Sequence, residues 1–451
     1  MAFKEQPPAG WKEAQPGDGA LKGKWWELYS DPALNALEEQ VAVNNQNVAQ
    51  AEAQFRQAKT SVRVARASLF PTVRIGFSAS VSQASGSGNV ANANGGNSGT
   101  RISYGFPLDV SWEPDLWGSI RRGVTGAAAN AQSFAALLEN ARLLYQSELA
   151  QDYFEIHGID ADIDLLRRTE ASYQEFLTLT RARYRSGVAS DLDVAQAESQ
   201  LYSAQSALID LGVQRAQFEH AIANLTGKAP VEVTIAPVVL NTQPPPVPIG
   251  VPSQLLERRP DIAANERRVA AANEQVGIAM AALYPTLTIS GTGGGQTAGL
   301  GKLISAPAHF WSLGGGLAQT VFDAGRRRAV IAGQEAAYDA TVAAYRQTVL
   351  TALQQVDDSL AELRILEVEG AKLEQAISSA NRALTVATAQ YRAGTASYLT
   401  VLISQAALLN AERAAVNLQA RRLTASVQLI QALGGGWDAS QLPSVQAVST
   451  K

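Results

Sequence analysis

The sequence predicts a mixed all-α and membrane-β protein, in which very long helices continue from short β-hairpins and one structural unit occurs twice. Three observations predict this class. Two long stretches lack proline and consist mainly of strong helix formers. The segments before them alternate polar and apolar residues, as strands with one apolar face do. Finally, the two halves share motifs at matching intervals, which indicates an internal repeat.

Composition excludes several classes of protein. Of the 451 residues, 46% are apolar and 17% are charged, so the chain can bury a large core. The net charge of −4 gives no sign of a nucleic-acid partner. With no cysteine and three scattered histidines, we expect neither a metal site nor another cofactor. No apolar run reaches the length of about 18 residues that a membrane-spanning helix needs.

The repeat is visible in both motifs and intervals. Residues 182–190 recur as residues 389–397, an offset of 207. The interval from Gly118 to Gly187 is 69 residues, and so is the interval from Gly325 to Gly394. We therefore divide the chain into an N-terminal extended segment (1–30), a first repeat (31–229), a proline-rich linker (230–252), a second repeat (253–437) and a C-terminal tail (438–451).

Each repeat contains a predicted hairpin of strands. Residues 72–81 and 102–112 alternate apolar and polar positions around a loop rich in Gly, Asn and Ser, so the first hairpin covers about 72–113. A weaker alternation places the second at about 286–322. Strands of about ten residues cross a bilayer when tilted. The pattern alone also fits a sheet lying on a soluble core, but large polar loops at one end favour an outer-membrane barrel.

Long helices fill most of the remaining chain. At about 1.5 Å per residue, each of the longest stretches would form a helix of roughly 100 Å, which must bury its apolar stripe against partners. An elongated helical bundle or coiled coil follows. The predicted helical stretches are 31–68, 118–184, 189–224, 261–283, 325–391 and 396–432.

A glycine separates the long helix from the returning helix in each repeat. Gly187 and Gly394 suit the left-handed end of a helix, and Ser190 and Ser397 can supply N-cap oxygens for the next one. A plain hairpin turn explains those residues but not the recurring aromatic, cation and leucine around them, so we predict exposed docking tips. The candidate docking residues are Tyr184, Arg185, Gly187, Ser190 and Leu192, with Tyr391, Arg392, Gly394, Ser397 and Leu399 in the second repeat.

No active site can be assembled from the sequence. The carboxylate pairs Glu38-Glu39 and Asp357-Asp358 lie on helical stretches with no histidine or cation nearby in the sequence, and we expect them to be solvated. The arginines at 121–122 and 326–328 fall where strands lead into helices, where they would meet lipid headgroups or solvent. We therefore predict that the protein is not an enzyme.

Read in order, the motifs resemble the TolC-like outer-membrane factors, in particular the lipoprotein branch that serves resistance-nodulation-division efflux pumps. The resemblance covers nearly the whole chain. It rests on Trp25-Trp26-Glu27-Leu28-Tyr29-Ser30-Asp31-Pro32, Leu69-Phe70-Pro71, Asp115-Leu116-Trp117-Gly118, Arg258-Arg259-Pro260-Asp261-Ile262, Tyr284-Pro285, Phe322-Asp323-Ala324-Gly325, Tyr391-Arg392-Ala393-Gly394 and Ala432-Leu433-Gly434-Gly435-Gly436-Trp437.

The resemblance implies a homotrimer in which four strands per protomer close a twelve-stranded β-barrel in the outer membrane of a Gram-negative bacterium. It implies that the helices continue as a long periplasmic α-barrel. Its tips would meet a periplasmic adaptor protein coupled to an inner-membrane transporter. The function implied is a passive exit duct of a tripartite efflux pump for drugs or other small molecules. Trimerisation also follows physically, because four strands alone would leave unpaired edges in lipid.

Two features depart from the family pattern. Processed members of this branch usually begin with a lipid-bearing cysteine, so we expect the native protein to carry a lipid ahead of the sequence or to be unlipidated. Some members close the tip with a ring of carboxylates, and the matching position here is Ile403. We therefore predict an apolar gate formed by Leu399 and Ile403, with Asp191 and Asp193 as the charged candidates.

Other functions stay open at this point. Within the same class, the duct could serve metal efflux or type I protein secretion. From a different class, long helices alone would fit a soluble coiled-coil scaffold, although the two hairpins and their matching distances to the tips argue against it.

Overall fold

We describe a computed structural model of the chain over residues 24–83, 100–238, 242–246, 255–303 and 305–449. Two compact units make up the fold, and each takes residues from both sequence repeats. The first unit comprises Met1–Phe55, Ser133–Asn265 and Ala344–Leu442, and it is helical. The second comprises Arg56–Gln132, Glu266–Ala343 and Pro443–Lys451, and it contains the sheet.

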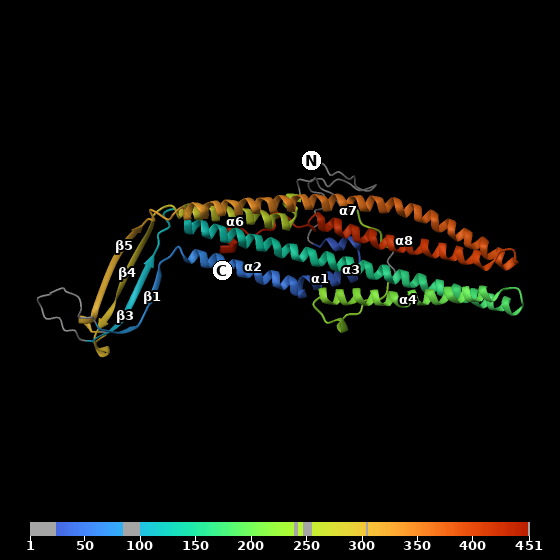
Figure 1. Cartoon of the computed structure of the whole chain (residues 1–451), viewed down its shortest axis with the longest axis horizontal. Helices are drawn as coiled ribbons and strands as arrows, with labels where there is room; N and C mark the ends of the chain where they lie inside the picture. Colours follow the sequence, from blue (N-terminus) through green and yellow to red (C-terminus); the bar gives the residue numbers. More distant parts are fainter. Residues whose placement is uncertain (1–23, 84–99, 239–241, 247–254, 304, 450–451) are drawn as a thin grey trace. The chain divides into compact units, whose positions relative to one another are not determined.

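The predicted helical stretches are confirmed, with one break. In Figure 1, α4 runs beside α3 and α8 beside α7. The α-helices are α1 (Pro32–Asn44), α2 (Gln46–Ala67), α3 (Ser119–Arg185), α4 (Asp191–Leu225), α5 (Leu255–Arg258), α6 (Pro260–Ala281), α7 (Arg326–Ala393), α8 (Tyr398–Ala432) and α9 (Val445–Ser449). Short 3-10 helices are η1 (Trp25–Tyr29), η2 (Pro230–Glu232), η4 (Leu300–Lys302), η5 (Ala306–Ala308) and η6 (Ala439–Gln441).

The break lies at Asn45, inside the stretch 31–68 that we predicted as one helix. Asn45 has an extended backbone, and its side-chain oxygen accepts hydrogen bonds from the amides of Asn47 (2.9 Å) and Val48 (3.2 Å). Its side-chain nitrogen donates to the carbonyl of Leu225 at 2.9 Å. Asn45 therefore starts α2 and also satisfies a carbonyl at the end of α4, which a continuous helix would not do.

The second repeat contains an equivalent junction, built from different side chains. Ala432, offset by 207 residues from Leu225, ends α8, and its carbonyl accepts a hydrogen bond from the Arg259 guanidinium at 3.1 Å. Arg259 is buried, forms a two-point ion pair with Asp261 (2.9 and 2.6 Å), and donates to Gln355 at 2.8 Å. Each junction thus joins the C-terminal end of one helix to the N-terminal start of another.

A glycine makes each junction possible. Gly227 and Gly434 both have positive φ, at +70° and +93°. A Cβ at Gly227 would collide with the carbonyl oxygen of Asn44, and one at Gly434 with that of Arg258. Only glycine permits both the left-handed conformation and this close approach of backbone to backbone.

Five strands form one antiparallel sheet in which the hairpins of the two repeats are neighbours. The strands are β1 (Thr72–Ile75), β2 (Ser78–Ser82), β3 (Arg101–Trp112), β4 (Thr286–Thr297) and β5 (His309–Ala318). The order is β1-β3-β4-β5, and β2 also pairs with β3, as Figure 1 shows for the labelled strands. Since β3 pairs with β4, the sheet joins one repeat to the other.

The strand predicted over 72–81 is interrupted between β1 and β2. Its register continues across the gap, because Ile75 pairs with Leu108 and Ser78 with Gly105. Pro107 lies opposite the gap, and proline has no N–H to donate to the ladder. Gly76 still donates its own N–H to the Pro107 carbonyl at 2.9 Å. The interruption therefore comes from the missing donor and leaves the alternation of faces unchanged.

The core of the helical unit gathers large aromatic side chains from distant parts of the chain. Residues 25–29 form η1, whereas we predicted an extended segment, and Trp25, Trp26 and Tyr29 are all buried. The Tyr29 hydroxyl lies 2.7 Å from the Ser426 hydroxyl of α8, and its ring packs 4.8 Å from the ring of Phe154. This packing fixes the start of the described chain against α3 and α8.

Replacing Arg259 tests the second junction. We expect Arg259→Ala to destabilise the folded chain by about 3 kcal/mol, because it removes the two-point ion pair of Asp261 and the side-chain donor to the Ala432 carbonyl. Arg259→Lys keeps the charge but loses the two-point geometry, and should recover only part of the loss. Arg167→Ala, an exposed change of the same charge on α3, is the matched control. Thermal unfolding in detergent is the measurement, and equal midpoints for Arg259→Ala and Arg167→Ala would contradict the assignment.

We expected both Glu38 and Glu39 to be solvated, but this is wrong for Glu38. Its side chain is fully buried, and neither carboxylate oxygen has a hydrogen-bond partner among the described residues. Burial raises the pKa of Glu38 well above its usual value. The carboxyl is therefore neutral in the folded chain under conditions that ionise it in the unfolded chain.

Because Glu38 is buried, the folding stability should depend on pH in a defined direction. Because the folded pKa lies above the unfolded one, Glu38 lowers stability progressively as pH rises above the ordinary carboxyl range. We expect Glu38→Gln to flatten the fall in unfolding temperature between acidic and alkaline pH, whereas Glu39→Gln, on an exposed side chain, leaves it unchanged. Parallel pH profiles for wild type and Glu38→Gln would show that this carboxyl does not titrate with folding.

Candidate membrane face and partner-docking tips

The register of the sheet separates one apolar face from one polar face. Residues directly opposite each other in antiparallel strands share a face, so Val73 pairs with Val110, Val110 with Gly291, and Gly291 with Leu313. The apolar face consists of Val73, Ile75, Phe77, Ala79 and Val81, then Ile102, Tyr104, Phe106, Leu108, Val110 and Trp112, then Leu287 and Ile289, and finally Trp311, Leu313 and Leu317.

This apolar face is exposed in the single chain. Trp311 is 82% exposed and Leu313 is 76% exposed. Val73 and Ile75 are 64% and 66% exposed. The other face carries hydroxyl and carboxylate groups, and Thr292 donates to Asp109 across it at 2.8 Å. A large apolar face with a polar reverse side requires an apolar environment on one side only, as lipid outside an aqueous channel provides.

The sheet also has two open edges. Among the described strands, β1 and β2 pair only with β3, and β5 pairs only with β4. The outward N–H and C=O groups of these edge strands therefore have no ladder partner among the described residues. In lipid such groups must be paired, so the sheet needs strands from further copies.

Of the arginines where strands lead into helices, Arg121, Arg122 and Arg327 form ion pairs, while Arg326 and Arg328 are exposed. Arg121 contacts Asp115 at 3.0 Å, and Arg122 contacts Glu274 at 3.1 Å. In the second repeat, Arg327 contacts Asp323 at 2.7 Å, and this hydrogen bond lowers the pKa of Asp323. These pairs fix the starts of α3 and α7.

The two helix hairpins turn at the predicted glycines. Gly187 and Gly394 have φ of +75° and +80°, the left-handed conformation expected where a helix ends. Ser190 caps α4 through a reciprocal pair of bonds, accepting from the Asp193 amide at 3.2 Å while Asp193 accepts from the Ser190 amide at 2.9 Å. The N-cap role predicted for Ser397 is wrong. Its hydroxyl makes no bond to the backbone of α8 and lies 3.4 Å from that of Thr400.

Tyr391 is buried, so its predicted place on an exposed tip is wrong. Its ring lies 5.7 Å from that of Tyr398, and the Arg183 guanidinium stacks over it at 4.5 Å. Arg183 also donates to the Tyr391 carbonyl, and Arg392 lies 3.5 Å from Glu175. These contacts join the tip of α3 and α4 to the tip of α7 and α8.

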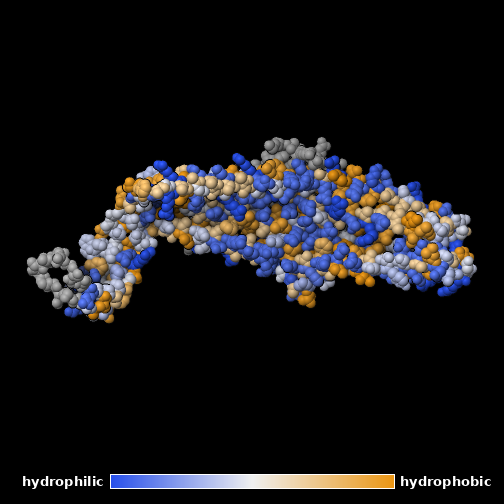
Figure 2. Space-filling view, viewed as in Figure 1, coloured by the Kyte–Doolittle hydropathy of each residue, from blue (hydrophilic) through white to orange (hydrophobic). Residues whose placement is uncertain are grey.

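The other candidate tip residues are exposed. Leu192 is 64% exposed, Leu399 is 48% exposed and Tyr184 is 47% exposed. Figure 2 shows apolar atoms at the surface among polar ones over these tips. The exposed set also includes Arg185, Gly187, Ser190, Asp191, Arg392, Gly394, Ser397 and Ile403, while Asp193 is half-buried. The tips thus present exposed leucines on a base held by buried tyrosines.

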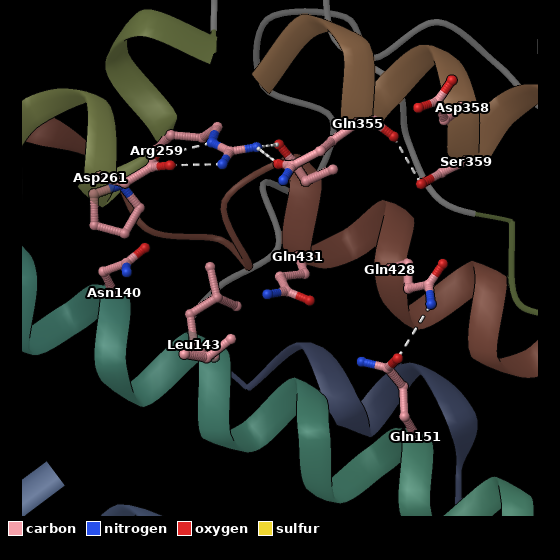
Figure 3. A pocket seen from close by; sticks show the side chains of 13 residues that line it. Asn140, Leu143, Gln151, Arg259, Asp261, Gln355, Asp358, Ser359, Gln428 and Gln431 are labelled. Atoms are coloured by element: carbon pink, nitrogen blue, oxygen red, sulfur yellow. Dashed lines mark hydrogen bonds and ion pairs between the residues drawn. The ribbon is translucent and has the colours of Figure 1, made fainter. Parts of the chain in front are cut away.

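A pocket of about 520 Å³ adjoins the Arg259 junction and was not predicted from the sequence. It lies between α3, the start of α6, α7 and the end of α8, and Figure 3 shows its lining. The motif around Arg258–Asp261 carried the resemblance, yet sequence spacing alone could not show that it meets α8 more than 170 residues away.

No helix in the described part of the chain is long and apolar enough to cross a membrane. Within the same residues, no group of histidine, cysteine, aspartate or glutamate side chains is arranged to hold a metal ion.

Comparison with known proteins decides the family. The model of the outer membrane efflux protein family matches residues 37–228 and again residues 251–435, once for each repeat. The chain belongs to the outer membrane efflux protein family. It is an outer-membrane channel with a periplasmic helical extension, it performs no catalysis, and it serves as the exit duct of an efflux pump. As in this family generally, it works as a trimer with pump partners.

Relatives of this family match almost end to end. The pyoverdine export outer membrane protein OpmQ of Pseudomonas putida is 32% identical over 96% of this chain and 93% of its own length. The probable efflux pump outer membrane protein TtgC of the same species is 30% identical over 93% of this chain and 86% of its own. The crystal structure of VceC from Vibrio cholerae is 29% identical, with a TM-score of 0.83 over 92% of this chain and all of that one.

Placing a charge on the apolar face tests its contact with lipid. We expect Leu313→Arg to reduce the folded channel recovered from outer membranes, since an arginine at the bilayer midplane costs about 2–4 kcal/mol. The neighbouring Ser312→Arg, on the opposite face of β5, should be tolerated. Recovery of heat-modifiable protein from membrane fractions is the readout. Equal recovery of both variants would contradict the assignment of Leu313 to the lipid-facing side, and loss of Ser312→Arg alone would show that the two faces are reversed.

Proposed function

We propose that the two hairpin tips dock a periplasmic adaptor protein, which couples the duct to an inner-membrane transporter. The supporting observation is that both repeats present an exposed leucine, Leu192 and Leu399, at equivalent places beside a turn. Buried Tyr391 and Tyr398 hold the leucines on a rigid base. Exposed apolar side chains on a preorganised surface are suited to binding another protein.

The cargo we propose is small molecules. Relatives named for pyoverdine export and for efflux pumps align over almost the whole chain, which supports small-molecule efflux over metal export or protein secretion. In this proposal the duct itself is passive, and selectivity resides in the transporter.

Charged substitutions at the tips test the docking role. We expect Leu192→Glu together with Leu399→Glu to weaken adaptor binding at least tenfold and to abolish dye efflux, because the variant places two charges in an apolar interface. Val231→Glu, at a residue 90% exposed on η2, is the matched control. Adaptor affinity and dye accumulation are the measurements. Unchanged affinity in a correctly assembled double variant would contradict docking at these tips.

The same tips carry the proposed gate. We propose that Leu399 and Ile403, 48% and 61% exposed in the single chain, form an apolar constriction in the assembled trimer. Asp193 is engaged in the N-cap of α4, where it accepts from both the amide and the hydroxyl of Ser190 at 2.9 Å. That engagement supports the apolar gate over a ring of aspartates.

Single-channel conductance distinguishes the two gates. Leu399→Ala with Ile403→Ala should raise conductance in a planar bilayer, because smaller side chains widen the constriction and hydrate it. Asp191→Asn, a neutral change at an exposed tip residue, should leave it unchanged. A rise in conductance for an Asp191 or Asp193 substitution, with none for the apolar pair, would replace the apolar gate by a charged one.

A further inference from the structure

The pocket beside the Arg259 junction has a lining that suits a neutral, hydrogen-bonding ligand. Its volume of about 520 Å³ lies within the usual range for ligand sites. Amide side chains dominate its polar lining. Gln428 donates to Gln151 at 3.2 Å and Gln355 accepts from Arg259 at 2.8 Å, whereas the side chains of Asn140 on α3 and Gln431 on α8 make no hydrogen bond to another described residue. Figure 3 shows both in the open space between the helices. The site therefore offers unused donors and acceptors together.

The charges of the pocket argue against an anionic ligand. Its one cation, Arg259, already makes four hydrogen bonds, two to Asp261 and one each to Gln355 and the Ala432 carbonyl. Asp358 adds a carboxylate to the lining. A phosphate or carboxylate would meet this negative charge without a free cation to offset it.

The lining also argues against an apolar drug as the ligand. Most of the side chains around the pocket carry amide or charged groups, which an apolar molecule would desolvate without replacing their hydrogen bonds. The apolar part is limited to a small patch that includes Leu143, Leu144 and Pro260. A suitable ligand therefore combines many hydrogen-bonding groups with small apolar surfaces.

We propose that this pocket binds an N-acetylated sugar unit of a glycan chain. Such a sugar carries hydroxyls and an acetamide, which match the donors and acceptors of the Asn140 and Gln431 amides. Its methyl group and ring C–H surface fit beside Leu143 and Leu144. Because α3, α6, α7 and α8 all line the pocket, a bound sugar would hold the junction of these helices together. The pocket is separate from the tips, so this site is independent of adaptor docking.

The experiment is a titration of the purified detergent-solubilised trimer with a chito-oligosaccharide, compared with a cello-oligosaccharide of equal length that carries a hydroxyl in place of each acetamide. We expect calorimetric binding of the first, at least tenfold tighter than the second, together with a rise in the unfolding temperature. Asn140→Leu and Gln431→Leu should each reduce the affinity tenfold or more. Gln174→Leu, an exposed amide elsewhere on α3, should not.

Four outcomes would overturn the proposal. These are no binding at millimolar sugar, equal binding of the two oligosaccharides, binding unaffected by both pocket variants, and preferential binding of an uncharged peptide instead of the sugar. Thermal unfolding of each variant without sugar separates loss of binding from loss of folding. A second pair, Asn140→Asp and Gln431→Glu, keeps the side-chain size and should also weaken binding if the amide donors are used.

Discussion

The structure depends on a constraint at the edges of its sheet. Five strands from both repeats form a sheet with an exposed apolar face, a polar reverse side and edge strands whose outer sides pair with no other described strand. Lipid cannot form hydrogen bonds with those edges, so the backbone groups there are paired only when further copies of the chain supply neighbouring strands. The trimeric channel of this family is the assembly that satisfies the constraint, and the polar face then lines the water-filled path.

Within the helical unit, the two repeats share the geometry of a helix-end junction but use different side chains to form it. The carbonyls of Leu225 and Ala432 end equivalent helices, yet one is satisfied by the amide of Asn45 and the other by the guanidinium of Arg259. Gly227 and Gly434 allow the same close backbone approach in both places. The requirement to satisfy helix-end carbonyls is thus constant, and the donor is free to vary. Only the second junction adjoins the amide-lined pocket described above.

Periodicity was sufficient to predict the long helices, both hairpins and the turning glycines, because these features depend on local sequence. The features that periodicity did not predict depend on contacts with residues far away in the sequence. The break at Asn45 requires the end of α4, and the break in the first strand requires Pro107 opposite. In the site, the exposed leucines were predicted, but Tyr391 is buried by contacts with Arg183 and Tyr398. Ser397 resembles Ser190 in position yet lacks the acidic partner three residues later that completes the cap at Ser190.

The measurement that tests this account most directly is the mass of the purified protein by light scattering, with and without detergent. The edges and the apolar face together predict a stable particle of three chains of 47.7 kDa that requires detergent to stay in solution. A monomer or dimer that stays soluble without detergent would contradict it, because the sheet edges and the apolar face would then be satisfied within fewer chains and without lipid.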